Sequence, residues 1–238
     1  MNLRALLRTL HPRQARQFPL RYALTAVAAV LLAAWLLCAL SLCAFRFLDP
    51  PTTALQTQRR IESWFQTAPY QKRYLFVPLS EISPDLQHAV IAAEDARFYQ
   101  HHGFDWQAIE LAAENDIDGG RRLRGGSTLT QQLVKNLFFG ASRSLLRKAA
   151  EFTLVPVAEL VLGKRRILEL YLNTVELGPG IYGVEAASRA WYSTSARHIT
   201  RDQASRLAAI LPAPRKRHPA RMNSYSAIIQ TRMRQMNW

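Results

Sequence analysis

Two neighbouring carboxylates, Glu94 and Asp95, are the first candidates for acid–base chemistry in this sequence. The helix predicted to precede them starts at Ser83, which is followed by Pro and Asp, and ends near Glu94. The negative end of the helix dipole, the adjacent acid and apolar Phe98 all disfavour the charged carboxylate and raise its pKa. Such a group suits proton transfer, whereas the competing interpretation is a pair of solvated charges at a helix end.

A glycine turn that leads into a helix is the second candidate. Residues 124–128 read Arg-Gly-Gly-Ser-Thr, and the spacing from Thr128 to Gln131 fits a capping box. Free backbone N–H groups and the dipole at such a helix start favour an anion, above all a phosphate. The run is no nucleotide P-loop, because Gly-x-x-x-x-Gly-Lys-[Ser/Thr] is absent, and an ordinary structural turn is the alternative.

A third candidate lies on a predicted helix that begins at Ser144. Arg147 and Glu151 are four residues apart and Lys148 and Glu151 three apart, so all three side chains share one helix face. The alternative is a set of exposed ion pairs, which are frequent and contribute little to stability.

Patterns that imitate metal sites fail on their spacing. The acidic run at 114–118 lacks the closing Glu of a calcium loop, because Gly125 stands at that position. His101, His102 and Asp105 do not have the ligand spacing of a zinc site. We therefore predict no dedicated metal site.

The distribution of charge places a membrane anchor at the N-terminus. The chain has 238 residues and a formal charge of +14, and residues 1–45 contain Arg but no acid. Residues 22–45 are uncharged and rich in Leu, Ala and Val, which is long enough to span a hydrocarbon core of about 30 Å. A cleaved signal peptide is the alternative, although its apolar region runs only about 7–15 residues.

Arg residues before the apolar run predict a cytoplasmic N-terminus and an exported body by the positive-inside rule. We expect a cytoplasmic segment at 1–21, a transmembrane helix at 22–45, a connector and entry segment at 46–78, and one domain at 79–238. The two cysteines, Cys38 and Cys43, fall in the predicted span, so the exported part has no disulfide.

The domain that positions these residues is predicted to be mostly α. Strand-like alternation is weak and confined to residues 74–79. After the helix that ends near Glu94, further helices are expected from Thr128, from Ser144 to Leu162 with a kink at Pro156 and a stop at Gly163, and from Arg166 to Asn173.

Taken together and in order, the motifs resemble the family-51 glycosyltransferases, which polymerise the glycan strands of peptidoglycan. The resemblance covers residues 79–219. The matching positions are Glu94, Asp95, Phe98, His101, Gly103 and Asp105 in the first motif, 124–132 with Lys135 and Asn136 in the second, Arg147, Lys148 and Glu151 in the third, and 167–173 and 178–187 in the last two.

The resemblance implies a lysozyme-like helical fold with a smaller, membrane-adjacent lobe between Trp106 and Arg143. The apolar run at 137–139 is then a candidate membrane-contacting surface, with ordinary core as the alternative. A monofunctional enzyme is expected, because the Ser-x-x-Lys and Lys-[Thr/Ser]-Gly patterns of a penicillin-binding domain are absent. Departures from the family pattern are Pro156 and the run Trp-Tyr-Ser at 191–193, and the role of the basic tail around Arg215 stays open.

The resemblance also implies an activity: lipid II is the acceptor, and a growing lipid-linked glycan is the donor. The new linkage is β-1,4, formed with inversion and with release of undecaprenyl diphosphate. Glu94 would be the general base, and Glu151 would orient the cations. Residues implied to bind the substrate or its diphosphate are Arg124, Ser127, Thr128, Gln131, Gln132, Lys135, Asn136, Arg147, Lys148 and Asn173.

No tightly bound cofactor is expected, and the candidate ion is Mg²⁺ or Mn²⁺ at the diphosphate. The resemblance places the chain in the inner membrane as a single-pass protein with a periplasmic catalytic domain. Expected partners are the membrane and other cell-wall synthases or divisome proteins, and not nucleic acid. Two alternatives stay open: a lysozyme-like hydrolase or lytic transglycosylase, and a non-catalytic, anchored glycan-binding protein.

Overall fold

A computed structural model describes residues 20–67, 69–110, 126–141 and 144–238. The chain divides into two compact units, Met1–Leu37 and Cys38–Trp238. Helix α2 (Leu20–Phe45) is long and apolar enough to cross a membrane, and in the described part of the chain it is the one such helix. It confirms the helix predicted at 22–45.

The segment expected as a connector contributes structure to the second unit. Helix α3 (Ala54–Ser63) is capped by Thr53, whose side chain accepts from the Gln56 backbone N–H at 3.2 Å. Leu55 and Gln56 are buried, and α3 packs against α6. The expected boundary at residue 78 is therefore not the boundary of the compact unit.

A small sheet joins this segment to the end of the longest helix. Its strands are β1 (Arg73–Tyr74), β2 (Glu176–Gly178) and β3 (Ile181–Tyr182), in the order β1-β3-β2, with β1 parallel and β2 antiparallel to β3. The strand predicted at 74–79 overlaps β1 at Tyr74 alone. Val77 is instead held by the side-chain amide of Asn173, which satisfies its backbone groups without a neighbouring strand.

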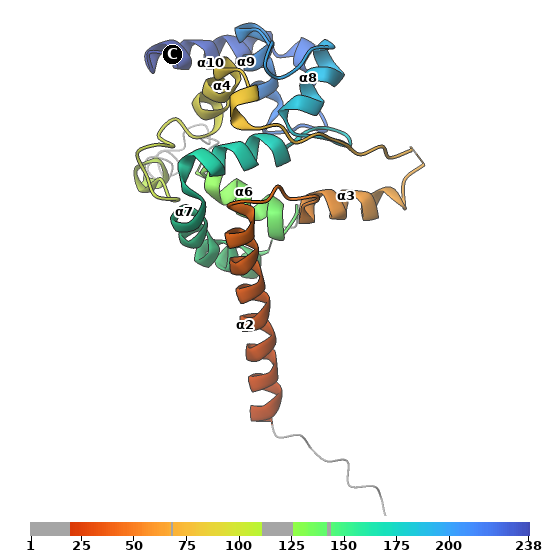
Figure 1. The fold of residues 1–238 in the computed structure, drawn as a ribbon, viewed down its shortest axis with the longest axis vertical. Helices are drawn as coiled ribbons and strands as arrows, with labels where there is room; N and C mark the ends of the chain where they lie inside the picture. The colour runs from red at the N-terminus through yellow and green to blue at the C-terminus, as the bar shows by residue number, and fades with distance from the viewer. Residues whose placement is uncertain (1–19, 68, 111–125, 142–143) are drawn as a thin grey trace, which may run out of the picture. The chain divides into compact units, whose positions relative to one another are not determined.

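One helical group contains the helix that ends at the first carboxylate. Helix α4 (Pro84–Glu94) has the predicted start and end, although the Ser83 side chain makes no capping bond. It lies side by side with α9 (Arg201–Ile210) and α10 (Asn223–Gln235), near α8 (Val184–Tyr192) (Figure 1). Two 3-10 turns, η1 (Leu79–Glu81) and η2 (Pro219–Arg221), complete this group.

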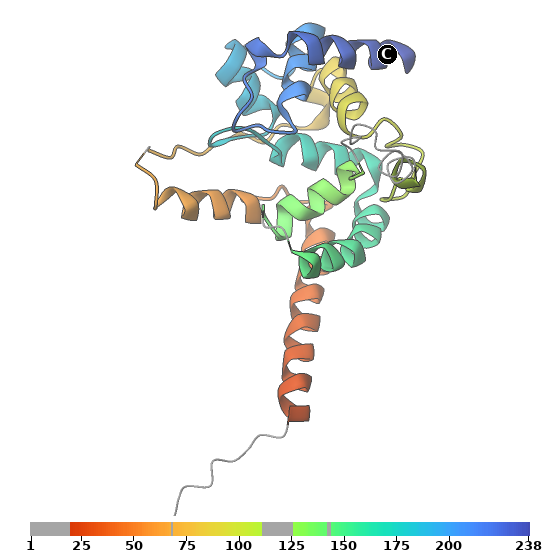
Figure 2. The same cartoon turned by 180° about the vertical axis from the view of Figure 1, so that it is seen from behind.

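The second helical group consists of α6 and α7. Helix α6 (Leu129–Phe138) begins with the predicted capping box of Thr128 and Gln131. Helix α7 (Leu145–Thr174) keeps helical angles at Pro156 and breaks at Gly163, where φ is +70°. The predicted break at Gly163 is confirmed, and the predicted kink at Pro156 stays a prediction. The part of α7 after Gly163 lies between α6 and the α4–α9–α10 group (Figures 1 and 2).

The unusual run at 191–193 closes α8 rather than disturbing it. Trp191 donates its indole N–H to the Leu177 carbonyl at 3.1 Å, and Ser193 ends the helix in the left-handed region with φ +55°. These contacts tie α8 to β2, so the departure from the family pattern affects local packing away from Glu94.

Candidate active site

Glu94 is the last residue of α4 and is held by a chain of polar side chains that leads to buried Tyr171. The Gln132 side chain donates to its carboxylate at 2.9 Å, and the Tyr171 hydroxyl donates to the Gln132 carbonyl oxygen at 3.0 Å. Tyr171 is fully buried and Glu94 is half-buried. Burial raises the pKa of Glu94, while the bond from Gln132 and the charge of Lys135 act in the opposite direction. The carboxylate is thus fixed in direction and disposed to take up a proton.

Asp95 connects the end of α4 to the start of α6. One of its carboxylate oxygens accepts the Leu129 backbone N–H at 2.9 Å, and the other pairs with His101 Nε2 at 2.9 Å. Asp95 thus takes one backbone N–H of this helix start, and the anion site predicted at Ser127 and Thr128 stays a prediction. Asp95 follows α4 immediately, which allows it to reach across to α6.

The loop after Asp95 brings together three groups with the chemistry of metal ligands. Asp95, His101 and Asp105 have ligand atoms within 4.8 Å of one another. Asp105 pairs with Arg97 and accepts the Ala108 backbone N–H at 2.9 Å. Asp95 accepts the Leu129 backbone N–H and pairs with His101. The three groups thus serve a hydrogen-bond network that shapes the loop.

A buried carboxylate gathers the cations of α7. Glu151 is 2% exposed, and it pairs with Arg147 and, at 3.4 Å, with Lys148. The predicted common face of these three residues is confirmed, and the burial of Glu151 rules out a purely exposed ion pair. Lys135 on α6 interacts electrostatically with these three α7 residues. Burial lowers its pKa, and the charges of Arg147 and Lys148 lower it further against the opposing effect of Glu151.

Two clefts meet at Gln132. The first, of about 360 Å³, is named the Glu94 cleft and is lined by Glu94, Asp95, Arg97, Ser127, Thr128 and Arg232 among others. The second, of about 350 Å³, is named the cation cleft and is lined by Arg59, Gln132, Lys135, Asn136, Arg147 and Glu176 among others. Gln132 lines the second cleft while bonding to Glu94 of the first, so the proposed base lies beside the cation cluster.

Several predicted binding residues are used within the fold. Asn173 is fully buried, and its side chain bonds to the backbone of Val77 and Glu169. The side chains of Thr128 and Gln131 bond to each other's backbone in the capping box. Both polar atoms of the Asn173 side chain and the side-chain oxygen of Gln131 are thus used within the fold, and the binding roles expected of these two residues stay predictions. Arg124 lies outside the described residues.

Other residues at the site were not predicted. Tyr171 orients Gln132, and its place in the fourth motif was an available signal. Arg232 of α10 reaches the Glu94 cleft from the basic tail, which the sequence leaves unassigned. Arg59 and Glu176 are 117 positions apart and pair at 3.1 Å, so no local pattern could have joined them.

A mostly helical fold with a half-buried carboxylate beside clustered cations is the arrangement expected of a glycosyltransferase. The chain belongs to the transglycosylase family, which it matches over residues 60–237. It is 50% identical to a biosynthetic peptidoglycan transglycosylase of Pseudomonas fluorescens, over 72% of this chain and 71% of that protein.

Proteins of the same description in Ectopseudomonas mendocina and Shewanella oneidensis are each 46% identical to the chain. They cover 85% and 83% of this chain and 86% and 85% of their own lengths, respectively. The function is that of a peptidoglycan glycosyltransferase.

Proposed function

We propose that the enzyme polymerises lipid II, with Glu94 as the general base and a lipid-linked glycan as the donor. The observation that carries this proposal is the position of a half-buried carboxylate next to an excess of cations. A glycosidase, which cuts a neutral sugar, uses a carboxylic acid to protonate its leaving group. A diphosphate leaves as an anion and needs cations instead.

The proposed reaction is a direct displacement. Glu94 takes the proton from the 4-hydroxyl of the acceptor sugar as that oxygen bonds to the anomeric carbon of the donor. The bond from that carbon to the diphosphate oxygen breaks with inversion, and undecaprenyl diphosphate leaves with the electron pair. Burial raises the pKa of Glu94, which makes it a better proton acceptor than a solvated carboxylate.

The cations of the second cleft would hold the departing diphosphate. Lys135 and Arg147 line this cleft, and Lys148 shares the Glu151 carboxylate with Arg147. The Nε group of Arg147 is buried and has no partner among the described residues, which leaves a donor for a ligand oxygen. Three cations face one carboxylate here, so the cluster retains positive charge for an anionic substrate.

A divalent cation, Mg²⁺ or Mn²⁺, would bind chiefly through diphosphate oxygens and water. Glu151 is already engaged by Arg147 and Lys148, which fits a substrate-borne ion better than a closed protein site. Such an ion would supply charge neutralisation at the leaving group.

We further propose that α2 anchors the enzyme in the inner membrane, with a cytoplasmic N-terminus and a periplasmic catalytic domain. Apolar side chains are exposed on the first half of α7, namely Leu145, Leu146, Phe152 and Leu160. They fit a membrane-contacting surface better than the predicted run at 137–139, because Leu137 is buried and Phe138 stacks on Phe45.

The decisive experiment supplies labelled lipid II and a divalent cation to the wild type and to Glu94→Gln. We expect the variant to lose about 10²- to 10⁴-fold in polymerisation rate, because general base catalysis contributes on that order. Glu81→Gln, which changes an exposed carboxylate paired with Arg197, is the matched control and should polymerise normally.

Equal polymer from the wild type and Glu94→Gln would contradict the mechanism, provided that both have the same thermal unfolding. Release of muropeptides from finished peptidoglycan would instead identify a hydrolase.

A further inference from the structure

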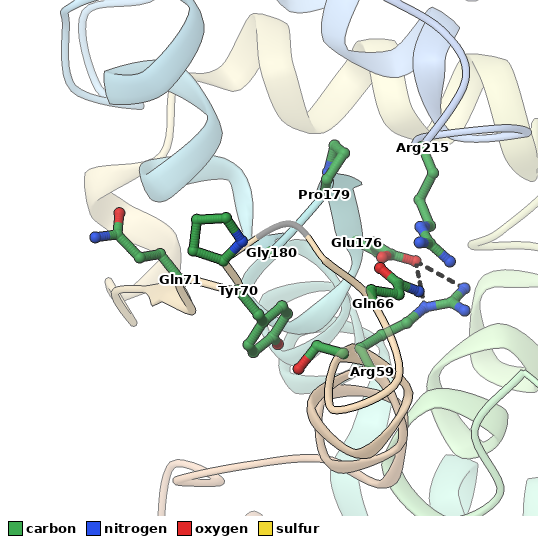
Figure 3. Close-up of a pocket in the computed structure, with 10 residues that line it drawn as sticks. Arg59, Gln66, Tyr70, Gln71, Glu176, Pro179, Gly180 and Arg215 are labelled. Carbon is green, nitrogen blue, oxygen red and sulfur yellow. Dashed lines mark hydrogen bonds and ion pairs between the residues drawn. The ribbon is translucent and has the colours of Figure 1, made fainter.

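A small pocket lies on the far side of the pair that walls the cation cleft. It is named the Glu176 pocket, has a volume of about 100 Å³, and is lined by Arg59, Tyr70, Gln71, Glu176, Gly180 and Arg215 among others. Figure 3 shows Arg59 and Arg215 approaching the Glu176 carboxylate from different segments. Arg59 and Glu176 line both the pocket and the cation cleft, so the two spaces share one wall.

Glu176 has an unused hydrogen-bond acceptor in this wall. The residue is 5% exposed, and its Oε2 atom accepts from Arg59 Nη2 at 3.1 Å and from Arg59 Nε at 3.3 Å. Its Oε1 atom is buried and has no partner in the part of the chain that the structure describes. A buried carboxylate oxygen without a donor is unfavourable, so this atom calls for an N–H or O–H from a ligand.

The charges around the pocket are balanced. Arg59 pairs with Glu62 at 2.8 Å as well as with Glu176, and Arg215 lies 3.8 Å from Glu62. These two cations face two carboxylates, Glu176 in the pocket lining and Glu62 just outside it, in contrast to the three cations against Glu151 beside the cation cleft. The pocket therefore has no excess charge for a further phosphate, and a neutral group with both a donor and an acceptor suits it better.

The volume also limits the ligand. A pocket of about 100 Å³ has room for roughly three water molecules at about 30 Å³ each, far below the roughly 300 Å³ at which sites for drug-sized ligands begin. One peptide group with a short side chain fits, whereas a sugar ring belongs in the larger clefts. The peptide N–H would donate to Glu176 Oε1 and its carbonyl would accept from Arg215.

The backbone around the pocket is fixed in place. Gly180 has φ +73°, and a Cβ there would lie 2.4 Å from the Gln71 carbonyl oxygen. Its own carbonyl accepts the Arg73 N–H at 2.8 Å, and the Tyr70 hydroxyl lies 3.0 Å from that of Tyr182. The segment that closes the pocket is thus held against β3, which pre-organises it for a ligand.

We propose that the Glu176 pocket is a subsite for a peptide group carried by the sugar substrate. The inference rests on the proposed function, because peptidoglycan precursors bring peptide as well as sugar to the enzyme. With the diphosphate bound in the cation cleft, the peptide of the same substrate would pass over the Arg59–Glu176 pair and enter the Glu176 pocket. Arg215 and Glu176 would then determine how well the enzyme distinguishes peptide-bearing from peptide-free substrate.

The test compares full-length enzymes on two lipid-linked disaccharide precursors, one with its peptide and one without. We expect the wild type to have a KM about tenfold lower for the peptide-bearing precursor, as one hydrogen bond to a charged group would give. Arg215→Ala should reduce that ratio towards one while kcat stays near the wild-type value. Lys216→Ala, which removes an exposed neighbouring cation that does not line the pocket, is the control and should keep the ratio.

Glu176→Gln provides a second variant, with the same expected loss of discrimination if it folds. Equal KM values for both precursors in the wild type, or an unchanged ratio in Arg215→Ala, would overturn the subsite and leave the proposed function standing. Absence of polymer from either precursor with the wild type would overturn the proposed function and the subsite with it.

Discussion

The cation cleft and the Glu176 pocket share the Arg59–Glu176 wall, yet their charges differ. On one side, Lys135, Arg147 and Lys148 face the single carboxylate of Glu151. On the other side, two cations face two carboxylates. Each side contains a buried polar atom without a partner among the described residues: a donor on Arg147 in the first and an acceptor on Glu176 in the second.

Under the proposed function, this difference would let one fold bind different parts of a composite substrate in different places. Excess cations in a partly buried cleft stabilise an anion more strongly than water does, because the local dielectric is low. A balanced cluster provides no such attraction and selects through hydrogen-bond geometry instead. Buried Arg side chains therefore do not by themselves identify a phosphate site. The carboxylates that surround them must be counted as well.

The largest expected effect tests the cation side. Lys135→Met should lower the polymerisation rate by about 10²- to 10³-fold, as the loss of one preorganised transition-state partner does. Arg215→Met, on the balanced side, should leave kcat within about twofold of the wild-type value. Rates with saturating lipid II measure both. A comparable loss of kcat in both variants would break the distinction between the two sides.

The next effect concerns stability. Arg147→Met leaves Glu151 buried with Lys148 and Lys135 as its remaining cations, and it should lower the free energy of unfolding by about 2 kcal/mol. This is less than the roughly 3–5 kcal/mol seen when a buried charge loses its sole partner. Arg197→Met removes an exposed pair with Glu81 and should change stability by at most about 1 kcal/mol. Denaturant unfolding of both variants checks the difference, and equal effects would place Glu151 in a solvated environment.

A smaller effect appears in the pH dependence of catalysis. Burial raises the pKa of Glu94 above its ordinary value of 4.5, so activity should fall as pH decreases through a midpoint above 4.5, where the base becomes protonated. Gln132→Leu removes a hydrogen bond that lowers this pKa, so the midpoint should move to higher pH. At the optimum the rate should also drop by about tenfold, because Glu94 loses its orienting partner. A midpoint that moves to lower pH would exclude Glu94 as the titrating base.

The raised pKa of Glu94 also determines how the stability of the fold changes with pH. A carboxyl whose pKa is raised in the folded state contributes stability that is fully present below the unfolded pKa and lost as pH rises through the folded pKa. Glu94 should thus make the wild type slightly less stable at neutral pH than at mildly acidic pH, and Glu94→Gln should remove this part of the dependence. Thermal unfolding across that pH window provides the measurement.

The smallest expected effect is a difference in stability between substitutions at two glycines of similar backbone angle, one of them beside the Glu176 pocket. Gly180→Ala and Gly163→Ala both place a side chain at a φ near +70°, which costs about 1–2 kcal/mol. At Gly163 a Cβ meets open space, whereas at Gly180 it meets the Gln71 carbonyl at 2.4 Å. The Gly180 variant should therefore lose roughly 1 kcal/mol more in unfolding free energy. Equal losses would mean that the backbone of residues 70–71 moves away from the new side chain at little cost in free energy.

Features governed by neighbouring residues could be predicted from the sequence. The capping box of Thr128 and Gln131, the end of α4 at Glu94 and the break at Gly163 depend on local backbone chemistry. The cation face of α7 follows from helical spacing alone. Predictions failed where a group distant in sequence satisfied a backbone that was expected to pair locally. The Asn173 side-chain amide bonds to the backbone of Val77, and no strand forms over residues 75–79.

The sequence by itself determined which chemical groups the protein has and on which helices they lie, because caps and helical periods act within a few residues. Only the tertiary structure decided which of them are free. Asp95 accepts one N–H of the helix start at which a phosphate was expected, and Gln132 turns to Glu94 because Tyr171 holds its other end. Arg59 and Glu176 are 117 positions apart in the sequence, yet they pair and form the wall between the two cavities. Hydrogen-bond capacity is used up by contacts that are distant in sequence, so a motif identifies a group without showing whether it can still bind a ligand.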